Sequence, residues 1–182
     1  MLKKKLWVHQ RSGAEGMDNG LEAAAEIGKP SSLFVARETQ RPLAVIECWE
    51  EIPCNPCEVS CPQNAIHIGK DITAAPSLDV GKCVGCGLCI ARCPGLAIFV
   101  VDFGYSDDNA AMSFPYEYLP VPRIDESVVA VDADGREVCE AKVLRVSNSG
   151  ANDRTPVVTI AVAKQSAMAV RSFARRGGSD ER

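Results

Sequence analysis

The chain has 182 residues, of which 46% are hydrophobic and 24% are charged, an ordinary composition for a soluble globular protein. Its length fits one domain with an appendage, or two small domains. The net charge of −4 argues against nucleic acid as a partner, since phosphate binding needs a basic face. No apolar run approaches the ~20 residues of a membrane helix, and the charged start lacks a signal-peptide core. We therefore expect a cytoplasmic protein without a membrane span.

Residues 1–42 form an N-terminal extension of mixed polarity. Within it, residues 17–27 have a helix-forming composition and end before Gly28 and Pro30, which favours a capping or docking helix. The apolar residues 43–46 predict a short buried strand that leads into Cys48.

An internal repeat follows this strand. The run C-x2-C-x3-C-P begins at Cys54 and recurs 32 residues later at Cys86, and each copy continues into an Ala-Ile pair. Each copy predicts a ligand loop, a short helical turn closed by Cys-Pro, and a strand, at residues 65–68 and 97–101. The intervening residues 71–79 read as a loop. The fold class we expect is α+β, with a pseudo-twofold core at residues 43–103.

The cysteines of this core indicate metal. In a cytosolic chain thiols are kept reduced, so dense cysteine spacing is typical of metal ligands rather than of disulfides. Seven of the nine cysteines lie in two dense groups: Cys54, Cys57, Cys61, Cys83, Cys86, Cys89 and Cys93.

The second copy is complete, because it reads C-x2-C-x2-C-x3-C-P from Cys83 to Pro94. In two-cluster ferredoxins the fourth cysteine of such a run binds the other cluster. Gly85 and Gly87 permit a tight backbone around the sulfides. A zinc ribbon would need C-x2-C pairs with a longer spacer, which fits badly. The ligands predicted for this second cluster are Cys83, Cys86, Cys89 and Cys61.

The first copy is irregular, because the 32-residue offset places Glu51 where a cysteine is expected. In one interpretation the loop 49–53 bulges out and Cys48 supplies the thiolate. In the other, Cys48 is a buried structural residue, and the cluster is either [3Fe–4S] or has Glu51 as an oxygen ligand. Soft thiolate is preferred over carboxylate here, which favours Cys48. The ligands predicted for this first cluster are Cys48, Cys54, Cys57 and Cys93.

The pattern changes after the core. Residues 104–123 contain several prolines and no regular period, which predicts a linker on the surface. Residues 124–176 predict a small β appendage, with a hairpin of residues 128–131 and 138–146 around the Asp134-Gly135 turn and a third strand at 156–162. Residues 164–176 could be a short helix or a bent strand, and 177–182 a tail.

Four further features are interpreted as structural. We expect Cys139 to be a small buried hydrophobe and His67 a surface histidine, although His67 could also be a proton-coupled neighbour of the first cluster. The Asp132–Gly135 stretch fails as a calcium loop and is read as a turn. The default for the arginines of the basic end is a solvated tail, with docking of an acidic partner as the alternative: Arg171, Arg175 and Arg176.

Residues 54–61 and 83–93 resemble the bacterial-type dicluster ferredoxin family, over residues 43–101 of the chain. The resemblance implies two βαβ-like halves with two [4Fe–4S] clusters. More weakly, residues 47–57 and the β tail are similar to the small iron–sulfur subunits of flavin-dependent amino-acid dehydrogenases, of the proline and hydroxyproline type, in anaerobes. This second resemblance implies a larger flavoprotein partner.

The sequence therefore predicts an electron-transfer subunit of an oxidoreductase, in a hetero-oligomer, with two [4Fe–4S] clusters. No nucleophile–base pair or phosphate loop is visible, so we expect no catalytic residue, no further cofactor and no catalysis by this chain alone. The alternatives are a free soluble ferredoxin and a cluster-dependent enzyme or structural cluster protein. The β appendage is expected to anchor the partner, so that truncation after Pro122 would spare both clusters.

Overall fold

The computed structural model describes residues 32–49, 51–152 and 154–174. The helix expected at residues 17–27, the arginines Arg175 and Arg176, and the tail at 177–182 lie outside the described residues.

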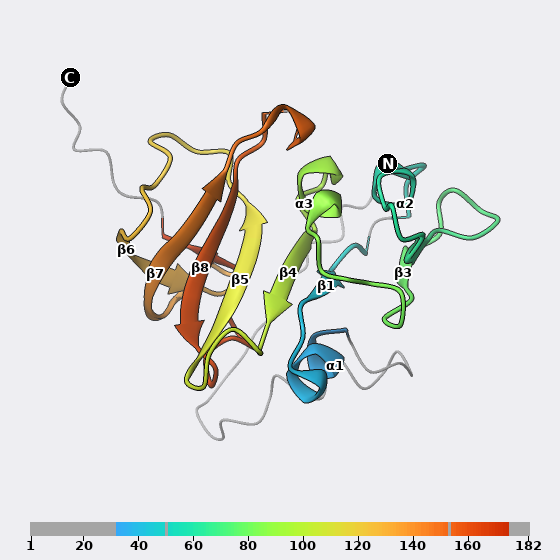
Figure 1. Ribbon diagram of the computed structural model, residues 1–182. Helices are drawn as coiled ribbons and strands as arrows, with labels where there is room; N and C mark the ends of the chain where they lie inside the picture. Colours follow the sequence, from blue (N-terminus) through green and yellow to red (C-terminus); the bar gives the residue numbers. More distant parts are fainter. Residues whose placement is uncertain (1–31, 50, 153, 175–182) are drawn as a thin grey trace, which may run out of the picture. The chain divides into compact units, whose positions relative to one another are not determined.

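The described part of the chain is built on a seven-stranded antiparallel sheet with the strand order β1-β4-β5-β8-β7-β6-β9 (Figure 1). Its strands are β1 (Leu43–Ile46), β4 (Ile98–Asp102), β5 (Asn109–Pro115), β6 (Ser127–Val131), β7 (Glu137–Ser147), β8 (Val157–Ala163) and β9 (Ser172–Phe173). A second, two-stranded sheet pairs β2 (Ile66–His67) with β3 (Ser77–Leu78).

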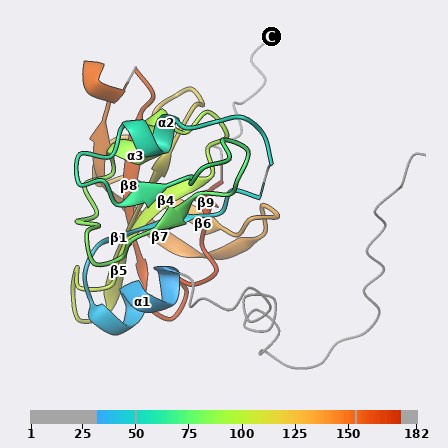
Figure 2. The same ribbon diagram turned by 90° about the vertical axis from the view of Figure 1, so that its right-hand side faces the viewer.

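Three short α-helices flank these sheets. They are α1 (Ser32–Thr39), α2 (Pro56–Val59) and α3 (Leu88–Arg92), and a 3-10 turn, η2, spans Gly150–Asn152. Helices α2 and α3 contact each other and lie at the opposite end of β1 and β4 from α1, as both views show (Figures 1 and 2). Pro56 begins α2, where its missing N–H leaves no donor unpaired.

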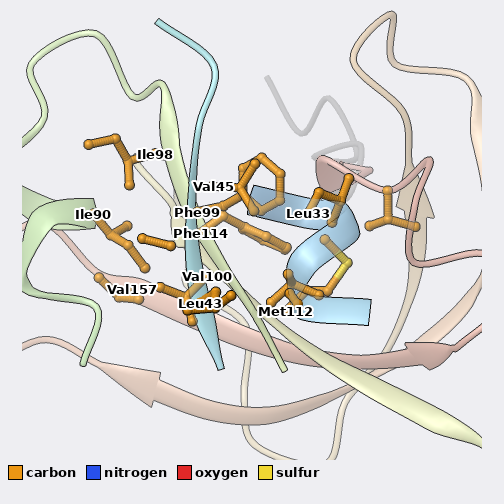
Figure 3. Packing of buried hydrophobic residues seen from close by; sticks show 14 of the residues in the cluster. Leu33, Leu43, Val45, Ile90, Ile98, Phe99, Val100, Met112, Phe114 and Val157 are labelled. Atoms are coloured by element: carbon orange, nitrogen blue, oxygen red, sulfur yellow. The ribbon is translucent and has the colours of Figure 1, made fainter. Parts of the chain in front are cut away.

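The buried side chains join the helices to the sheet (Figure 3). Leu33 of α1 and Ile90 of α3 belong to the same hydrophobic cluster as Met112 of β5 and Ile160 of β8. Burial alternates along β5 and β8, as expected for strands with one face on the core. Since each large apolar side chain contributes about 1.5–3 kcal/mol when buried, this cluster is the main stabilising feature of the described fold.

Several predicted strands are confirmed. Residues 43–46 form β1, and the strand expected at 97–101 is β4, shifted by one residue. The predicted hairpin is β6–β7, and Gly135 has a φ of 80° in its turn, a conformation that glycine adopts without strain. The strand expected at residues 156–162 is β8, shifted by one residue. Of the alternatives for residues 164–176, the structure has a turn followed by the short strand β9.

The expectation of an irregular linker at residues 104–123 is wrong for Asn109–Pro115, which forms β5. This strand pairs with β4 on one side and with β8 on the other. Alternating apolar residues at Ala110, Met112 and Phe114 explain it, because each is buried on one face of the sheet. One sheet therefore runs across the expected boundary between core and appendage. The α+β ferredoxin-like core itself stays a prediction.

The continuity of the sheet changes the expected result of truncation after Pro122. Removing β6–β9 would leave β5 without its seven register partners in β8 and would expose Met112 and Phe114. Burial of each large apolar side chain contributes about 1.5–3 kcal/mol, and the free energy of unfolding of a typical domain is only about 5–15 kcal/mol. Exposing several of these side chains would therefore remove much of the stability of the fold. We expect the truncated chain to lose cooperative thermal unfolding, measured by circular dichroism.

A chain that ends at Ala174 is the matched control, because it keeps all described strands and the hydrogen bond from Ala174 N to Val129 O at 2.7 Å. We expect it to melt as the full chain does. A truncated chain that still melts cooperatively would show that residues 43–122 fold without the rest of the sheet.

Candidate metal centre

The four cysteines assigned to the second cluster line one cavity, here called cavity 2. Cys61 follows α2, Cys83 and Cys86 lie in the loop before α3, and Cys89 lies within α3. Apolar residues make up much of the rest of the lining, together with Gln63, Gly85 and Gly87: Ala44, Pro62, Ala65, Ile66, Leu78, Val84 and Leu88.

The loop of Cys83 and Cys86 is shaped by a close backbone contact. Gly85 has a φ of 64°, and a Cβ at this position would lie 2.5 Å from Cβ of Pro42. Any side chain here would both strain the backbone and displace the α1–β1 connection. The glycine that the sequence suggested for a tight loop is thus required by packing as well as by conformation.

The four cysteines assigned to the first cluster line a second cavity, here called cavity 1. Its lining comprises Cys48, Cys54, Cys57 and Cys93, together with Ile52, Ala74, Pro76, Pro94 and Ile98. Glu51 is exposed and is not part of this lining. The placement of Cys48 thus favours the interpretation in which the loop bulges and a fourth thiol reaches the site. The ligand assignment itself stays a prediction.

The two Cys-Pro turns, residues 61–65 and 93–97, repeat each other closely. The N–H of Ala65 donates to Sγ of Cys61 at 3.3 Å, and the N–H of Ala97 donates to Sγ of Cys93 at 3.4 Å. Both turns place the residue before the alanine at a positive φ, 46° at Asn64 and 53° at Leu96. Amide hydrogen bonds to ligand sulfurs are a main influence on the potential of such sites.

These amide donors were missed by the sequence reasoning, although a signal was present. The alanines of the repeated Ala-Ile pairs are the donors, and the isoleucines, Ile66 and Ile98, are both buried. A repeat that preserves Ala-Ile after Cys-Pro could therefore have indicated a shared turn geometry as well as a shared ligand spacing.

Burial and mutual repulsion act on the thiols of each cavity. Burial raises the pKa of Cys89 to about 12, with smaller contributions from the neighbouring thiols of Cys83, Cys86 and Cys61. Burial also raises the pKa of Cys57, with Cys93 and Cys54 adding to the increase. The metal-free thiols of Cys57 and Cys89 therefore keep their protons at neutral pH, and metal binding must release them.

The donor set fits iron–sulfur clusters. Each cavity presents four thiols, and in each one cysteine sulfur accepts an amide hydrogen bond from the following turn. Within residues 32–49, 51–152 and 154–174, no group of three or more His, Cys, Asp or Glu side chains is arranged so that it could hold a single metal ion.

Comparison with known proteins agrees with this donor set. A family model described as a 4Fe-4S dicluster domain matches residues 52–97, about a quarter of the chain. The chain therefore contains a ferredoxin-type iron–sulfur domain, and its role is in electron transfer. The match begins after Cys48. No curated protein and no solved structure matches the chain.

None of the helices in the described residues is long and apolar enough to span a membrane.

The remaining predicted residues that the structure describes are not among the lining residues of either cavity. His67 is exposed on β2, with Nδ1 3.8 Å from Oε1 of Glu58, and Cys139 is half-buried against the core. The expectation of a solvated tail is wrong for Arg171. Its guanidinium pairs with Glu47 at 2.8 Å and lies over the ring of Phe99.

The raised pKa of Cys89 predicts a pH dependence of the metal-free chain. Below about pH 9 this thiol is protonated in both the folded and the unfolded chain, so its contribution to stability is fully present. Between about pH 9 and about 12 the unfolded chain loses this proton and the folded chain keeps it. We expect the free energy of unfolding to fall by up to about 1.4 kcal/mol per pH unit in this window.

Urea unfolding of the metal-free chain at a series of pH values measures this fall, and Cys89→Ala is the control. The variant lacks the titrating thiol, so its stability should decline less steeply above about pH 9. Equal slopes for the two chains would contradict the pKa shift of Cys89.

Proposed function

We propose that this chain is an electron-transfer subunit that relays electrons through two [4Fe–4S] clusters between a partner flavoprotein dehydrogenase and an acceptor. The observation that supports it is the pair of cavities, each lined by four cysteines drawn from both copies of the repeat. When bound, an iron–sulfur cluster supplies a centre that accepts or donates one electron.

The residues of this chain would hold the clusters and shelter them from water. Cys57 and Cys89 are buried on neighbouring helices, and the buried Ile66 and Ile98 line cavity 2 and cavity 1 respectively. Such surroundings limit access of water and strengthen the effect of the amide donors on the sulfurs. The chain itself contributes position and environment, which is why we assign the catalysed reaction to a partner.

A shallow apolar hollow lies between the two helices that carry cavity cysteines. It is lined by Pro56, Val59, Ser60, Leu88 and Arg92, and Val59 is 76% exposed. Leu88 also lines cavity 2, so a protein docked here would come close to the cysteines. Exposed apolar groups gathered at one place are typical of interaction sites. This hollow supports a partner docked at the clusters, and it fits a transient encounter of a free ferredoxin as well.

The two-cluster composition is tested by iron and sulfide analysis after anaerobic reconstitution. We expect about eight iron and about eight sulfide atoms per chain. Cys48→Ser should disturb only the first cluster, because Cys48 lines cavity 1 and not cavity 2. Low-temperature paramagnetic resonance should show that change, and Glu51→Ala should leave the spectrum as in the wild type.

Other results would indicate a different cluster composition. About four iron atoms would contradict two clusters, and about seven would favour a [3Fe–4S] first cluster. Loss of the first cluster in Glu51→Ala, with an unchanged spectrum in Cys48→Ser, would transfer the ligand role to Glu51.

Association with a flavoprotein is tested by purification from the native host, with two variants of matched exposure. Val59→Asp places a charge in the hollow, whereas Leu119→Asp changes a residue that is 78% exposed between β5 and β6. We expect Val59→Asp to weaken retention of a flavin-containing partner about ten-fold, a free-energy change of about 1.4 kcal/mol. Leu119→Asp should retain the flavin-containing partner as well as the wild type does.

A wild-type chain that elutes alone in size-exclusion chromatography would favour the free ferredoxin. If both variants retain the partner equally, the hollow is not its docking site.

A further inference from the structure

Arg171 lies far along the chain from the cysteines of the repeat, yet its side chain binds Glu47, the residue before Cys48. Its Nε donates to both carboxylate oxygens of Glu47, at 3.0 and 2.9 Å, and Nη2 lies 2.8 Å from Oε1 of Glu47. Its Nη1 donates to the carbonyl oxygens of Met168 and Val170, at 2.9 and 2.8 Å. The guanidinium is thus held in one orientation by two kinds of acceptor.

The pair is sheltered from solvent. The side chain of Arg171 is only 20% exposed and that of Glu47 33%. Cζ of Arg171 lies 4.9 Å from the centroid of the Phe99 ring, on β4. A planar guanidinium that binds a carboxylate with two donors and stacks on a ring fixes both direction and distance, as a lysine could not.

Glu47 is the residue at which the β1–β4 pairing ends, directly before Cys48. It follows β1, and its N–H donates to the carbonyl of Ala97 at 2.8 Å, which continues the β1–β4 pairing. In the described part of the segment, the next backbone hydrogen bond joins Cys54 N to Ile72 O at a long 3.4 Å. Cys48 therefore lies between a fixed residue and a loop with little backbone support.

The corresponding cysteine of the second copy, Cys83, is supported differently. Its N–H donates to Asp79 O at 3.1 Å, and its carbonyl accepts from Nη1 of Arg41 at 2.9 Å. Arg41 also donates to the carbonyl of Val80. Arg41 and Glu47 lie at opposite ends of β1. One arginine, Arg41, thus binds the carbonyl of the first cysteine of cavity 2, whereas Arg171 binds the residue before the first cysteine of cavity 1.

We propose that Arg171 is a positioning residue for the first cluster: by binding Glu47 it fixes the end of β1 and delivers the thiol of Cys48 into cavity 1. This inference rests on the proposed two-cluster function. It gives the C-terminal strands a role in one cluster and not in the other, because the arginine that reaches cavity 2 comes from the N-terminal side of β1.

The test is alkylation of the reconstituted full-length chain with iodoacetamide, followed by mass spectrometry that locates the modified cysteines. Arg171→Gln keeps a polar side chain but loses the charge and the paired donors. Outer-shell changes of this kind cost roughly 10- to 100-fold in metal affinity. We expect the cysteines of cavity 1 to react roughly 10- to 100-fold faster than in the wild type, and those of cavity 2 at the wild-type rate.

Four further variants make the result specific. Arg41→Gln should show the reverse selectivity, with faster reaction at Cys83 and its partners. Arg136→Gln, which breaks an exposed pairing with Asp134 in the β6–β7 turn, should change neither set. Glu47→Gln should resemble Arg171→Gln. In the double variant the cysteines of cavity 1 should react no faster than in either single variant, because both changes break the same ion pair.

If all eight cysteines of Arg171→Gln reacted faster than in the wild type by the same factor, the inference would be overturned, because this result would indicate general loosening of the fold. Wild-type rates in this variant would overturn it as well. If the cysteines of cavity 1 in Arg171→Lys react at the wild-type rate, the paired donors of the guanidinium are not needed to position Cys48. If the wild type itself leaves the cysteines of cavity 1 unprotected, the two-cluster function fails and this inference with it.

Discussion

The described structure depends on one constraint: each cavity is lined by four cysteines, and these four never come from one copy of the repeat alone. Cys61 leaves the first copy to line cavity 2, and Cys93 leaves the second copy to line cavity 1. The two sites therefore cannot close independently. Contact between α2 and α3 and the matching Cys-Pro turns follow from this exchange, because each turn must present its sulfur across the boundary. Even the positive φ of Leu96, uncommon for a bulky residue, is explained by its place in such a turn.

The sheet gives this exchange a fixed base. Strand β4 follows the second Cys-Pro turn directly, pairs with β1 and with β5, and thereby joins cavity 1 to the strands of the C-terminal half. Buried residues on β5 and β8 make that junction part of one hydrophobic cluster. The C-terminal half was expected to be a separate appendage with an apolar face free for a partner. In the structure its apolar residues, among them Val143, Val158 and Ile160, are already buried in the sheet, and the apolar hollow between α2 and α3 is the better candidate for docking.

Local patterns predicted local features well. The four cysteines predicted for each cluster line one cavity each, although their role as ligands stays a prediction, and alternating or continuous apolar runs anticipated β1, β4 and the β6–β7 hairpin. Strand β5 was missed although Ala110, Met112 and Phe114 alternate, because nearby prolines and turn residues dominated the interpretation. The pairing of Arg171 with Glu47 could not have been found this way. It joins residues 124 positions apart, and only the sheet brings them together. Tertiary contacts of this kind leave no periodic trace in the sequence.

The irregular first copy and the distant arginine have a common physical explanation. Between Cys83 and Cys86 two residues hold the thiols close, whereas five residues separate Cys48 from Cys54. A longer connection has more conformations, so it fixes its ends less firmly and costs more entropy to order. That loop also carries the exposed Trp49 and Ile52. A chain with such a loop needs another way to hold Cys48, and the ion pair at Glu47 supplies it from outside the matched domain. The C-terminal strands thus belong to the metal centre as much as to the sheet.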